Sequence, residues 1–226
     1  AALPILAACL LTEEELVIAN VPRIRDTEAQ IALLANLGVE TEWVEDNTIR
    51  LCAKNVTDTT LDEDLSAAIR ASFLMAGPLL ARFGEVHMPP PGGDFIGRRR
   101  LDAHLDAFRE LGARIGGQRM IELNAPPGGL RAAEIFMDEP SVMGTENALM
   151  AAALIPGETT ILNAASEPHV QDLAHLLVKM GAPISGIGSN VMVVSGQDKL
   201  GGAEHTVTPD HIEIASFMAI AAATGG

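Results

Sequence analysis

The most regular feature of the sequence is a set of short segments in which almost every position is apolar. They are rich in Ala, Leu, Ile and Met and occur at 2–11, 71–81, 146–155 and 212–223. A helix without a polar face must be buried on every side, either in a protein core or in a membrane. All four segments are much shorter than the roughly 18 apolar residues that a membrane-spanning helix needs. The pattern therefore predicts four central core helices.

The segments between these helices follow a common order of elements. Short β-branched strands are predicted after three of the apolar helices, at 16–20, 85–89 and 159–163. An amphipathic helix comes next in each case and ends at a glycine, namely Gly38, Gly112 and Gly181. Glycine suits the left-handed position that follows the last turn of a helix. Further strands are predicted at 48–53 and 190–196.

The spacing of these elements predicts an internal repeat. The turn after each apolar helix falls at equivalent positions that are separated by 70, 73 and 68 residues, namely Glu14, Gly84, Gly157 and Gly225. We therefore expect three α/β units of roughly 70 residues, near 1–70, 71–145 and 146–208, and a further unit that opens at 209–226. The chain begins without Met inside a helical pattern, so we expect it to be part of a longer polypeptide.

One unit of the repeat carries an insertion. From the turn to the glycine that ends the amphipathic helix, the first and third units take 24 residues each, whereas the second takes 28. The excess falls in PPPGGDFIGRRR, at 89–100. A loop that occurs in one copy of a structural repeat is not required by the fold, and such loops often carry function.

The composition of this loop suits the binding of anions. Three consecutive arginines at 98–100 could hold phosphate or carboxylate groups through forked hydrogen bonds. Asp94 could act as an acid, as a base or as a partner of these arginines. The glycines at 92, 93 and 97 and the prolines at 89–91 predict a lid with a stiff root. The alternative is an exposed loop in which the opposite charges merely neutralise each other, which contributes little energy.

Two other positions are candidates for ligand contacts. Arg70 stands at the start of an apolar helix, where an unpaired charge is costly, so it should meet either a bound anion or an acidic neighbour. Pro140 and Ser141 precede the helix predicted at 146–155, and the free N–H groups there could bind a phosphate. An ordinary N-cap at this place is equally consistent with the sequence.

Overall composition narrows the class of protein. Aromatic residues make up 3% of the 226 and Tyr is absent, so small aliphatic side chains must fill the core, which favours closely packed helices. The net charge of −15 argues against nucleic acid and anionic membrane as partners. Cys9 and Cys52 have no metal-ligand spacing and are predicted to be buried thiols. No signal peptide is visible, so we expect a cytoplasmic protein. The spacing of the cysteines gives no reason to expect a metal site.

Longer stretches of the sequence carry a family resemblance. From residue 1 to residue 226 the chain resembles the enolpyruvyl transferases, through AALPILAACLL, NVPRIRD, RASFLMAGPLLARFG, PGGDFIGRR, PSVMGTEN, NAASEPHVQDLAHLL and LGGAEHTVTPDHIE. The members that act on a sugar nucleotide fit better than those of the shikimate pathway. The resemblance implies an inside-out α/β domain of three repeated units, with buried parallel helices and outer sheets. This domain would span 1–208, and 209–226 would begin a second domain.

The resemblance also implies a reaction. Family members of this kind transfer the enolpyruvyl group of phosphoenolpyruvate to the 3-hydroxyl of UDP-N-acetylglucosamine, the first committed step of peptidoglycan precursor synthesis. No metal or organic cofactor is implied, and the expected partners are the two substrates and the rest of the polypeptide, without which this chain should be inactive. The alternatives are a relative with another acceptor, such as shikimate phosphate, and a non-catalytic paralogue that binds sugar nucleotides.

Individual roles follow from the matching motifs. Arg70 and Arg99 match the arginines that bind phosphoenolpyruvate. The residues that match nucleotide-binding segments are Leu101, Asp102, Ala103 and His104 near the uracil, and Ser141, Val142 and Met143 near the diphosphate and uridine. Asp94 is the candidate catalytic residue, at a lid position where most members carry a cysteine. Members with Asp there resist fosfomycin, which alkylates that cysteine, so the resemblance predicts insensitivity to this drug.

Overall fold

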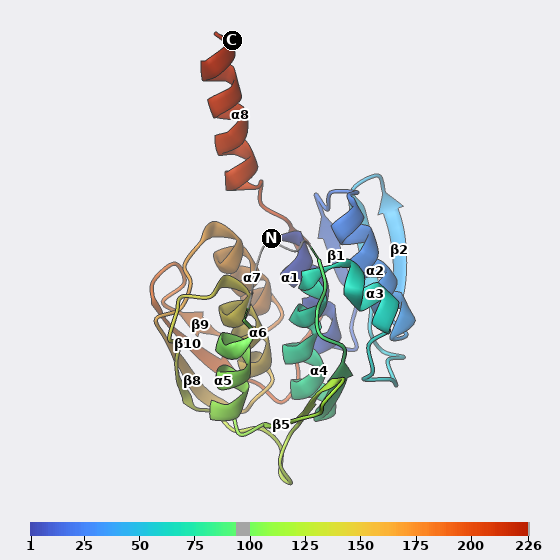
Figure 1. The fold of residues 1–226 in the computed structure, drawn as a ribbon, viewed down its shortest axis with the longest axis vertical. Helices are drawn as coiled ribbons and strands as arrows, with labels where there is room; N and C mark the ends of the chain where they lie inside the picture. The colour runs from blue at the N-terminus through green and yellow to red at the C-terminus, as the bar shows by residue number, and fades with distance from the viewer. Residues whose placement is uncertain (94–99, 226) are drawn as a thin grey trace.

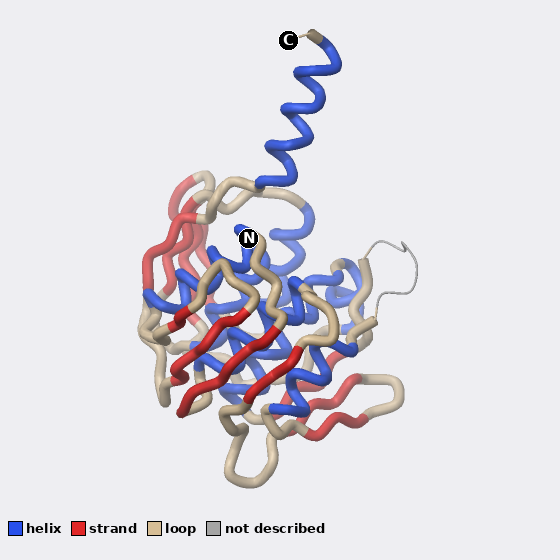
Figure 2. The backbone as a smooth tube through the Cα atoms, turned by 90° about the vertical axis from the view of Figure 1, so that its left-hand side faces the viewer, coloured by secondary structure: helices blue, strands red, loops and turns tan. Residues whose placement is uncertain are grey.

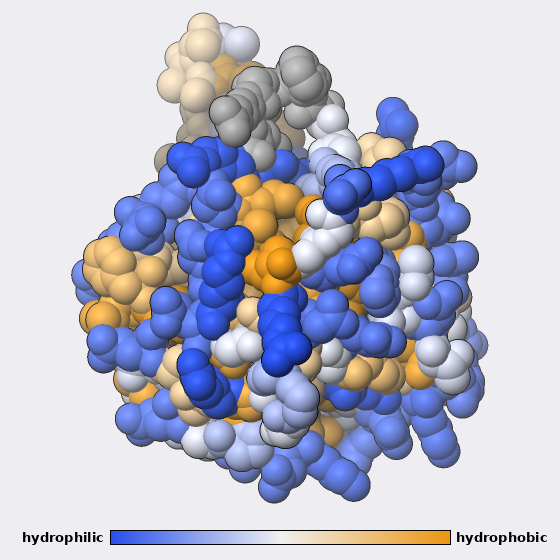
Figure 3. All heavy atoms as spheres, turned by 60° about the horizontal axis from the view of Figure 1, so that its bottom comes forward, coloured by the Kyte–Doolittle hydropathy of each residue, from blue (hydrophilic) through white to orange (hydrophobic). Residues whose placement is uncertain are grey.

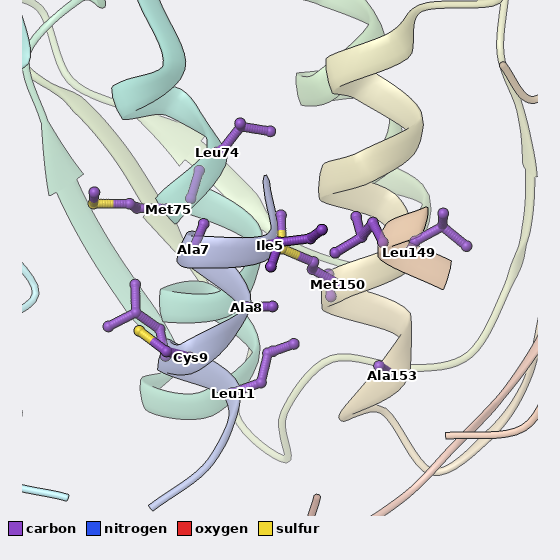
Figure 4. Close-up of a cluster of buried hydrophobic side chains, with 14 of the residues drawn as sticks. Ile5, Ala7, Ala8, Cys9, Leu11, Leu74, Met75, Leu149, Met150 and Ala153 are labelled. Atoms are coloured by element: carbon purple, nitrogen blue, oxygen red, sulfur yellow. The ribbon is translucent and has the colours of Figure 1, made fainter. Parts of the chain in front are cut away.

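Three buried helical segments form the centre of the molecule. A computed structural model describes residues 1–93 and 100–225. The central segments are α1 (Ala2–Ala7) with the 3₁₀ helix η1 (Ala8–Leu11), the 3₁₀ helix η2 (Arg70–Met75) with α4 (Ala76–Phe83), and α6 (Val142–Ala153). Figure 4 shows Ile5, Leu74 and Met150 from these three segments converging in the core. The prediction of core helices is confirmed for these three segments.

The three segments run parallel to one another. Their first residues line one cavity, which includes Ala2, Ala71 and Val142. Their last residues line a second cavity, which includes Leu11 and Ala81 and the residue after α6. At this C-terminal end, the guanidinium of Arg82 donates hydrogen bonds to the carbonyl oxygens of Leu10, Thr12 and Ala53, at 3.0, 3.1 and 3.0 Å. Arg82 thereby satisfies two carbonyl groups at the end of η1 and one after the strand that ends at Cys52.

Each unit surrounds this centre with a strand, an amphipathic helix and a two-stranded hairpin. The first unit has β1 (Leu16–Ala19), α2 (Arg25–Asn36), β2 (Glu40–Glu45) and β3 (Thr48–Cys52). The second has β4 (Glu85–Met88), α5 (Asp102–Glu110), β5 (Arg114–Gly116) and β6 (Ile121–Asn124). The third has β8 (Gly157–Leu162), α7 (Pro168–Lys179), β9 (Ile184–Ser185) and β10 (Val191–Gly196). The strands lie outside the helices (Figure 2), which confirms the predicted fold class.

The units are joined in a ring, because each contributes its last extended segment to the sheet of another unit. The third unit ends in β11 (Ala203–Thr206), which pairs in parallel with β1. The second ends in β7 (Glu134–Phe136), which pairs in parallel with β8. The first contributes a single parallel bridge from Thr60 to His87, just before the short helix α3 (Glu63–Ala68). Sequence analysis did not predict these connections.

The predicted glycine stops are confirmed at the ends of α2, α5 and α7. Gly38, Gly112 and Gly181 have φ of 100°, 96° and 108°. At the first of them, the Gly38 N–H bonds to Ala35 O and the Val39 N–H bonds to Leu34 O, and the other two sites repeat both bonds. This is the Schellman arrangement, which satisfies the last carbonyl groups of a helix. The turn at Glu14 differs from its counterparts, because Gly84, Gly157 and Gly225 have positive φ and Glu14 does not.

The fourth apolar helix is exposed, contrary to the prediction that it lies in the core. α8 (His211–Thr224) projects from the body (Figure 1). Ile212, Phe217 and Met218 are 63%, 63% and 68% exposed. A helix that is apolar all round needs cover, and none of the residues that the structure describes provides it. No helix in the described part of the chain has the length and apolar character to cross a membrane.

A buried polar cluster fixes the segment that leads to α8. The carboxylate of Asp172 on α7 accepts hydrogen bonds from His205 Nε2 at 2.9 Å and from the N–H and hydroxyl of Thr208, both at 3.0 Å. Burial by itself raises the pKa of Asp172, but the hydrogen bonds from His205 and Thr208 outweigh it, so the pKa lies below its ordinary value. Asp172 therefore ties α7 to the strand β11 and to the start of the linker.

The surface and the two thiols agree only partly with expectation. Figure 3 shows a face at the end of the molecule opposite α8 that is mainly hydrophilic around an apolar centre. Cys9 is buried, and burial raises the pKa of its thiol. Cys52 is only half-buried; it is the last residue of β3, and its thiol donates to Glu13 O at 3.4 Å.

Candidate active site

The root of the inserted loop is packed closely against the end of α3 and the start of η2. The N–H groups of Gly92 and Gly93 donate to Ser66 O and Ala67 O, at 3.2 and 3.3 Å. A Cβ atom on Gly92 would lie 1.9 Å from Ala67 O, and Gly93 has φ of 89°. These two glycines thus permit close backbone contact, a different role from the flexibility expected of them. Asp94, Gly97, Arg98 and Arg99 lie outside the described residues.

Arg70 is half-buried where η2 begins, and it reaches the far end of the same loop. Its Nη2 donates a hydrogen bond to the carbonyl oxygen of Arg100 at 3.0 Å. The bond joins the helix start to the segment that leads into α5. Because this partner is a main-chain carbonyl, the expected bound anion or acidic neighbour of Arg70 stays a prediction. The positive charge of the Arg70 side chain therefore lies beside Arg100, where the loop returns to the body of the molecule.

The predicted residues at the start of α5 lie next to Arg70 and α6. Leu101 is the N-cap residue of α5, and Asp102 forms an ion pair with Arg100. Because both of these charged side chains are at least half exposed, the pair contributes little to stability. Ala103 faces α6 so closely that a Cβ atom on Gly144 would lie 3.2 Å from the Ala103 Cβ. The starts of α5 and α6 are therefore in direct contact.

His104 is part of the core rather than of the surface. It is 3% exposed, and its ring meets the edge of Phe73 with centroids 4.9 Å apart. Burial first, and then the charge of Arg70, lowers the pKa of His104 to about 3. Its imidazole is therefore neutral, and any contact with a ligand would have to come from the main chain. The assignment of His104 as a nucleotide-binding residue stays a prediction.

Asn147 joins three of the helical segments and was missed by sequence analysis. Its Oδ1 accepts from the Gly77 N–H at 2.8 Å, and its Nδ2 donates to Phe73 O at 2.9 Å. In a continuous α-helix the Gly77 N–H would bond to Phe73 O directly. The amide thus takes the place of a missing helical bond at the junction of η2 and α4. Its Nδ2 also donates to His104 Nδ1 at 2.9 Å, which places the imidazole proton on Nε2.

The start of α6 brings the remaining predicted residues to the same region. Ser141 is the N-cap, and its Oγ accepts from the Gly144 N–H at 3.2 Å. The N-cap alternative is therefore correct, although the first N–H groups of α6 remain without a helical partner. Val142 and Met143 line a cavity of about 740 Å³ that also includes Leu74 of η2.

The structure thus collects most of the predicted residues at one end of the central helices. Arg70 contacts the segment of Arg100, which leads into 101–104, and this segment contacts the start of α6 at 141–144. A half-buried guanidinium beside the free N–H groups of a helix start suits a phosphate or carboxylate group. The adjoining cavity is large enough for an organic ligand.

Comparisons with known proteins agree with this arrangement. The family model described as EPSP synthase (3-phosphoshikimate 1-carboxyvinyltransferase) matches residues 1–226. A UDP-N-acetylglucosamine 1-carboxyvinyltransferase from Bradyrhizobium diazoefficiens is 53% identical over 99% of this chain and 51% of its own length. One of the same name from Treponema denticola is 50% identical over 100% of this chain and 53% of its own length. The chain spans about half the length of these curated relatives.

A solved structure shares the fold at lower sequence identity. The enolpyruvyl transferase NikO from Streptomyces tendae superposes with a TM-score of 0.82 and 22% identity, over 96% of this chain and 51% of NikO. Together with the match of the family model to every residue, the ring of three units and the residues gathered beside Arg70 lead to one conclusion: the chain belongs to the EPSP synthase family of enolpyruvyl transferases.

Proposed function

We propose that this chain provides the first domain of a UDP-N-acetylglucosamine 1-carboxyvinyltransferase. The observation that carries the proposal is the contact between the segments of Arg70, Arg100–His104 and Ser141–Met143 at one end of the central helices. Relatives that bear this name are 50–53% identical over nearly the whole chain. Residues 209–226 would begin the second domain, which would cover the exposed face of α8. The reaction would then take place between the two domains.

Within this proposal, the cationic residues bind the anionic substrate. Arg70 and Arg99 would hold the phosphate and carboxylate groups of phosphoenolpyruvate by charge-assisted hydrogen bonds. The starts of α5 and α6, at 101–104 and 141–143, would hold the nucleotide. The hydroxyl of the acceptor gives up its proton and attacks the central carbon of phosphoenolpyruvate while the alkene carbon takes up a proton. Phosphate then leaves and the same carbon loses a proton, which restores the double bond as an enol ether. No metal or organic cofactor is required by these steps.

Asp94 is the candidate for the proton donor. An aspartate has an ordinary pKa of about 3.9, and neighbouring arginines lower it further, so it is a poor acid at neutral pH. The negative charges of bound phosphoenolpyruvate would raise the pKa of Asp94 when the loop closes. We therefore expect Asp94 to act as an acid only in the loaded state. The pH optimum should then lie below that of an Asp94→Cys variant, whereas identical pH profiles would contradict this role.

The direct test is phosphate release from phosphoenolpyruvate by the full-length protein, with UDP-N-acetylglucosamine as acceptor. Release should be unaffected by fosfomycin, because a carboxylate offers no thiolate for alkylation, and Asp94→Cys should become sensitive to the drug. Shikimate 3-phosphate in place of the sugar nucleotide tests the other acceptor. If neither acceptor supports release while UDP-N-acetylglucosamine still binds, the protein is a binding paralogue and the proposed activity is wrong.

A further inference from the structure

Glu146 is a buried acidic residue that none of the steps above uses. It lies in α6, one turn after Val142, and it is 2% exposed. Its Oε1 atom has no hydrogen-bond partner among the described residues. The neighbouring polar side chains of α6 are all engaged, since Thr145 accepts from the Ala165 N–H and Asn147 bonds to other helical segments. Leaving a buried carboxyl group without a partner is unfavourable for folding.

Burial changes the chemical state of this carboxyl group. It raises the pKa of Glu146 to about 8, and the negative charge of Glu167 adds to the rise. The Oε2 atom of Glu167 is likewise buried without a hydrogen-bond partner in the described part of the chain. At neutral pH Glu146 is therefore largely a neutral acid. A neutral carboxyl group can both donate and accept a hydrogen bond.

The carboxyl group borders the cavity of about 740 Å³ at the start of the central helices. Val142 and Met143 line the same cavity, and residues three and four positions apart share one face of a helix. Glu146 thus lies beside the residues that the proposed function assigns to the sugar nucleotide. The cavity offers ample space for a sugar unit, which can supply the missing hydrogen-bond partner.

The surroundings restrict the kind of group that Glu146 can bind. The cavity is also lined by acidic side chains, namely Asp26, Asp210 and Glu213. Acidic groups disfavour a phosphate, so an uncharged part of the ligand fits better than the diphosphate. Within residues 1–93 and 100–225 no group of three or more His, Cys, Asp or Glu side chains could hold a metal ion. An uncharged hydroxyl or amide group is the chemistry that remains.

We propose that Glu146 is a specificity-determining residue whose carboxyl group hydrogen-bonds to a hydroxyl or amide group of the acceptor's sugar. The inference rests on the proposed function, because it places the sugar of the nucleotide in this cavity. It adds a contact that distinguishes the sugar from the rest of the nucleotide. The contact would balance the unfavourable burial of the carboxyl group only when the ligand is bound.

The test compares the binding of UDP-N-acetylglucosamine and of UDP to the full-length protein by titration calorimetry. Glu146→Leu should weaken binding of the sugar nucleotide by about 3–10-fold, as expected for the loss of one hydrogen bond. It should leave the affinity for UDP unchanged. Glu146→Gln keeps a donor and an acceptor and should bind the sugar nucleotide nearly as the wild type does. Met150→Leu, buried on the same helix away from the cavity, is the matched control.

Thermal unfolding without ligand adds a second readout. Glu146→Leu should raise the Tm, because an apolar side chain replaces a buried polar group that lacks a partner. A purely structural role would instead lower the Tm and leave the ratio of the two affinities unchanged. Equal affinity of the wild type and Glu146→Leu for UDP-N-acetylglucosamine, or an equal loss for UDP, would overturn the inference. If the wild type does not bind UDP-N-acetylglucosamine at all, the proposed function itself fails.

Discussion

Replacing Asn147 by Leu tests whether one amide holds the centre of the site together. The leucine has a similar volume, so the change removes hydrogen bonds while leaving little empty space. Asn147 is fully buried, and its side chain bonds to Gly77, Phe73 and His104. All three partners are also buried or part of a central helix. The substitution therefore leaves polar groups without water as a replacement partner.

The size of the effect follows from counting the groups that lose their partner. The Phe73 carbonyl oxygen still accepts a hydrogen bond from the Ala76 N–H, so it does not become unsatisfied. The Gly77 N–H and His104 Nδ1 lose the partner that Asn147 supplied. An unsatisfied buried group costs about 1–3 kcal/mol, so two of them cost roughly 2–6 kcal/mol. Proteins are stable by only about 5–15 kcal/mol, so the loss is a large part of the total.

Urea unfolding followed by circular dichroism measures this loss as a change in the free energy of unfolding. Met150→Leu is the matched control, because it is a volume-conserving change at a buried position of the same helix without hydrogen bonds, and it should cost less than about 1.5 kcal/mol. A loss below about 1 kcal/mol for Asn147→Leu would refute the reasoning. It would mean that the Gly77 N–H bonds directly to Phe73 O once the amide is removed.

Three further changes test other parts of the fold. Arg82→Met removes the donor to three main-chain carbonyl groups and should lower the free energy of unfolding by about 2–4 kcal/mol, measured by urea unfolding. The advantage of wild type over Asp172→Asn should be present above the ordinary aspartate pKa of about 3.9 and should be lost as the pH falls through the lower pKa that this carboxyl group has in the folded protein. Acid titration of the Tm of both proteins checks this. Gly92→Ala brings a Cβ atom against Ala67 O and should raise the KM for phosphoenolpyruvate, whereas Gly116→Ala, where the nearest atom is 3.8 Å away, should not.

The parts of the fold that sequence analysis predicted are those that depend on local signals. Apolar segments and glycine stops are written into short stretches, so the three core helices and the ends of α2, α5 and α7 were predicted correctly. The strands β7 and β11 were not predicted, because each is defined by its pairing with a strand of another unit rather than by a local pattern. The burial of α8 was predicted wrongly, because an apolar sequence indicates that a helix must be buried but does not indicate which part of the protein covers it.

The site was predicted from motifs, whereas its supporting contacts were not. Asn147 stands at the start of a segment whose later positions, 148–155, are all apolar, and its partners Gly77 and His104 are far away in the sequence. A signal was nevertheless present, because a polar side chain inside a core helix must find hydrogen bonds elsewhere. Glu146 and Asn147 are two such residues in succession. Within the described chain Asn147 meets this requirement, whereas the Oε1 atom of Glu146 has no partner.

The second unit differs from the other two at the point where the insertion begins. In the first and third units, Asn20 and Asn163 adopt a left-handed conformation after the strand, and each donates to a carbonyl oxygen just beyond the parallel partner strand, at 2.8 Å. In the second unit the N–H of Leu61 bonds to His87 O in the equivalent way, but Met88 takes the place of the asparagine. The parallel pairing there is reduced to one bridge, and the chain is free to run into the insertion. The ring of three similar units is therefore asymmetric at Met88, which cannot make the hydrogen bond of the two asparagines. The loop that follows Met88 returns to the body at Arg100, whose carbonyl oxygen accepts from Arg70.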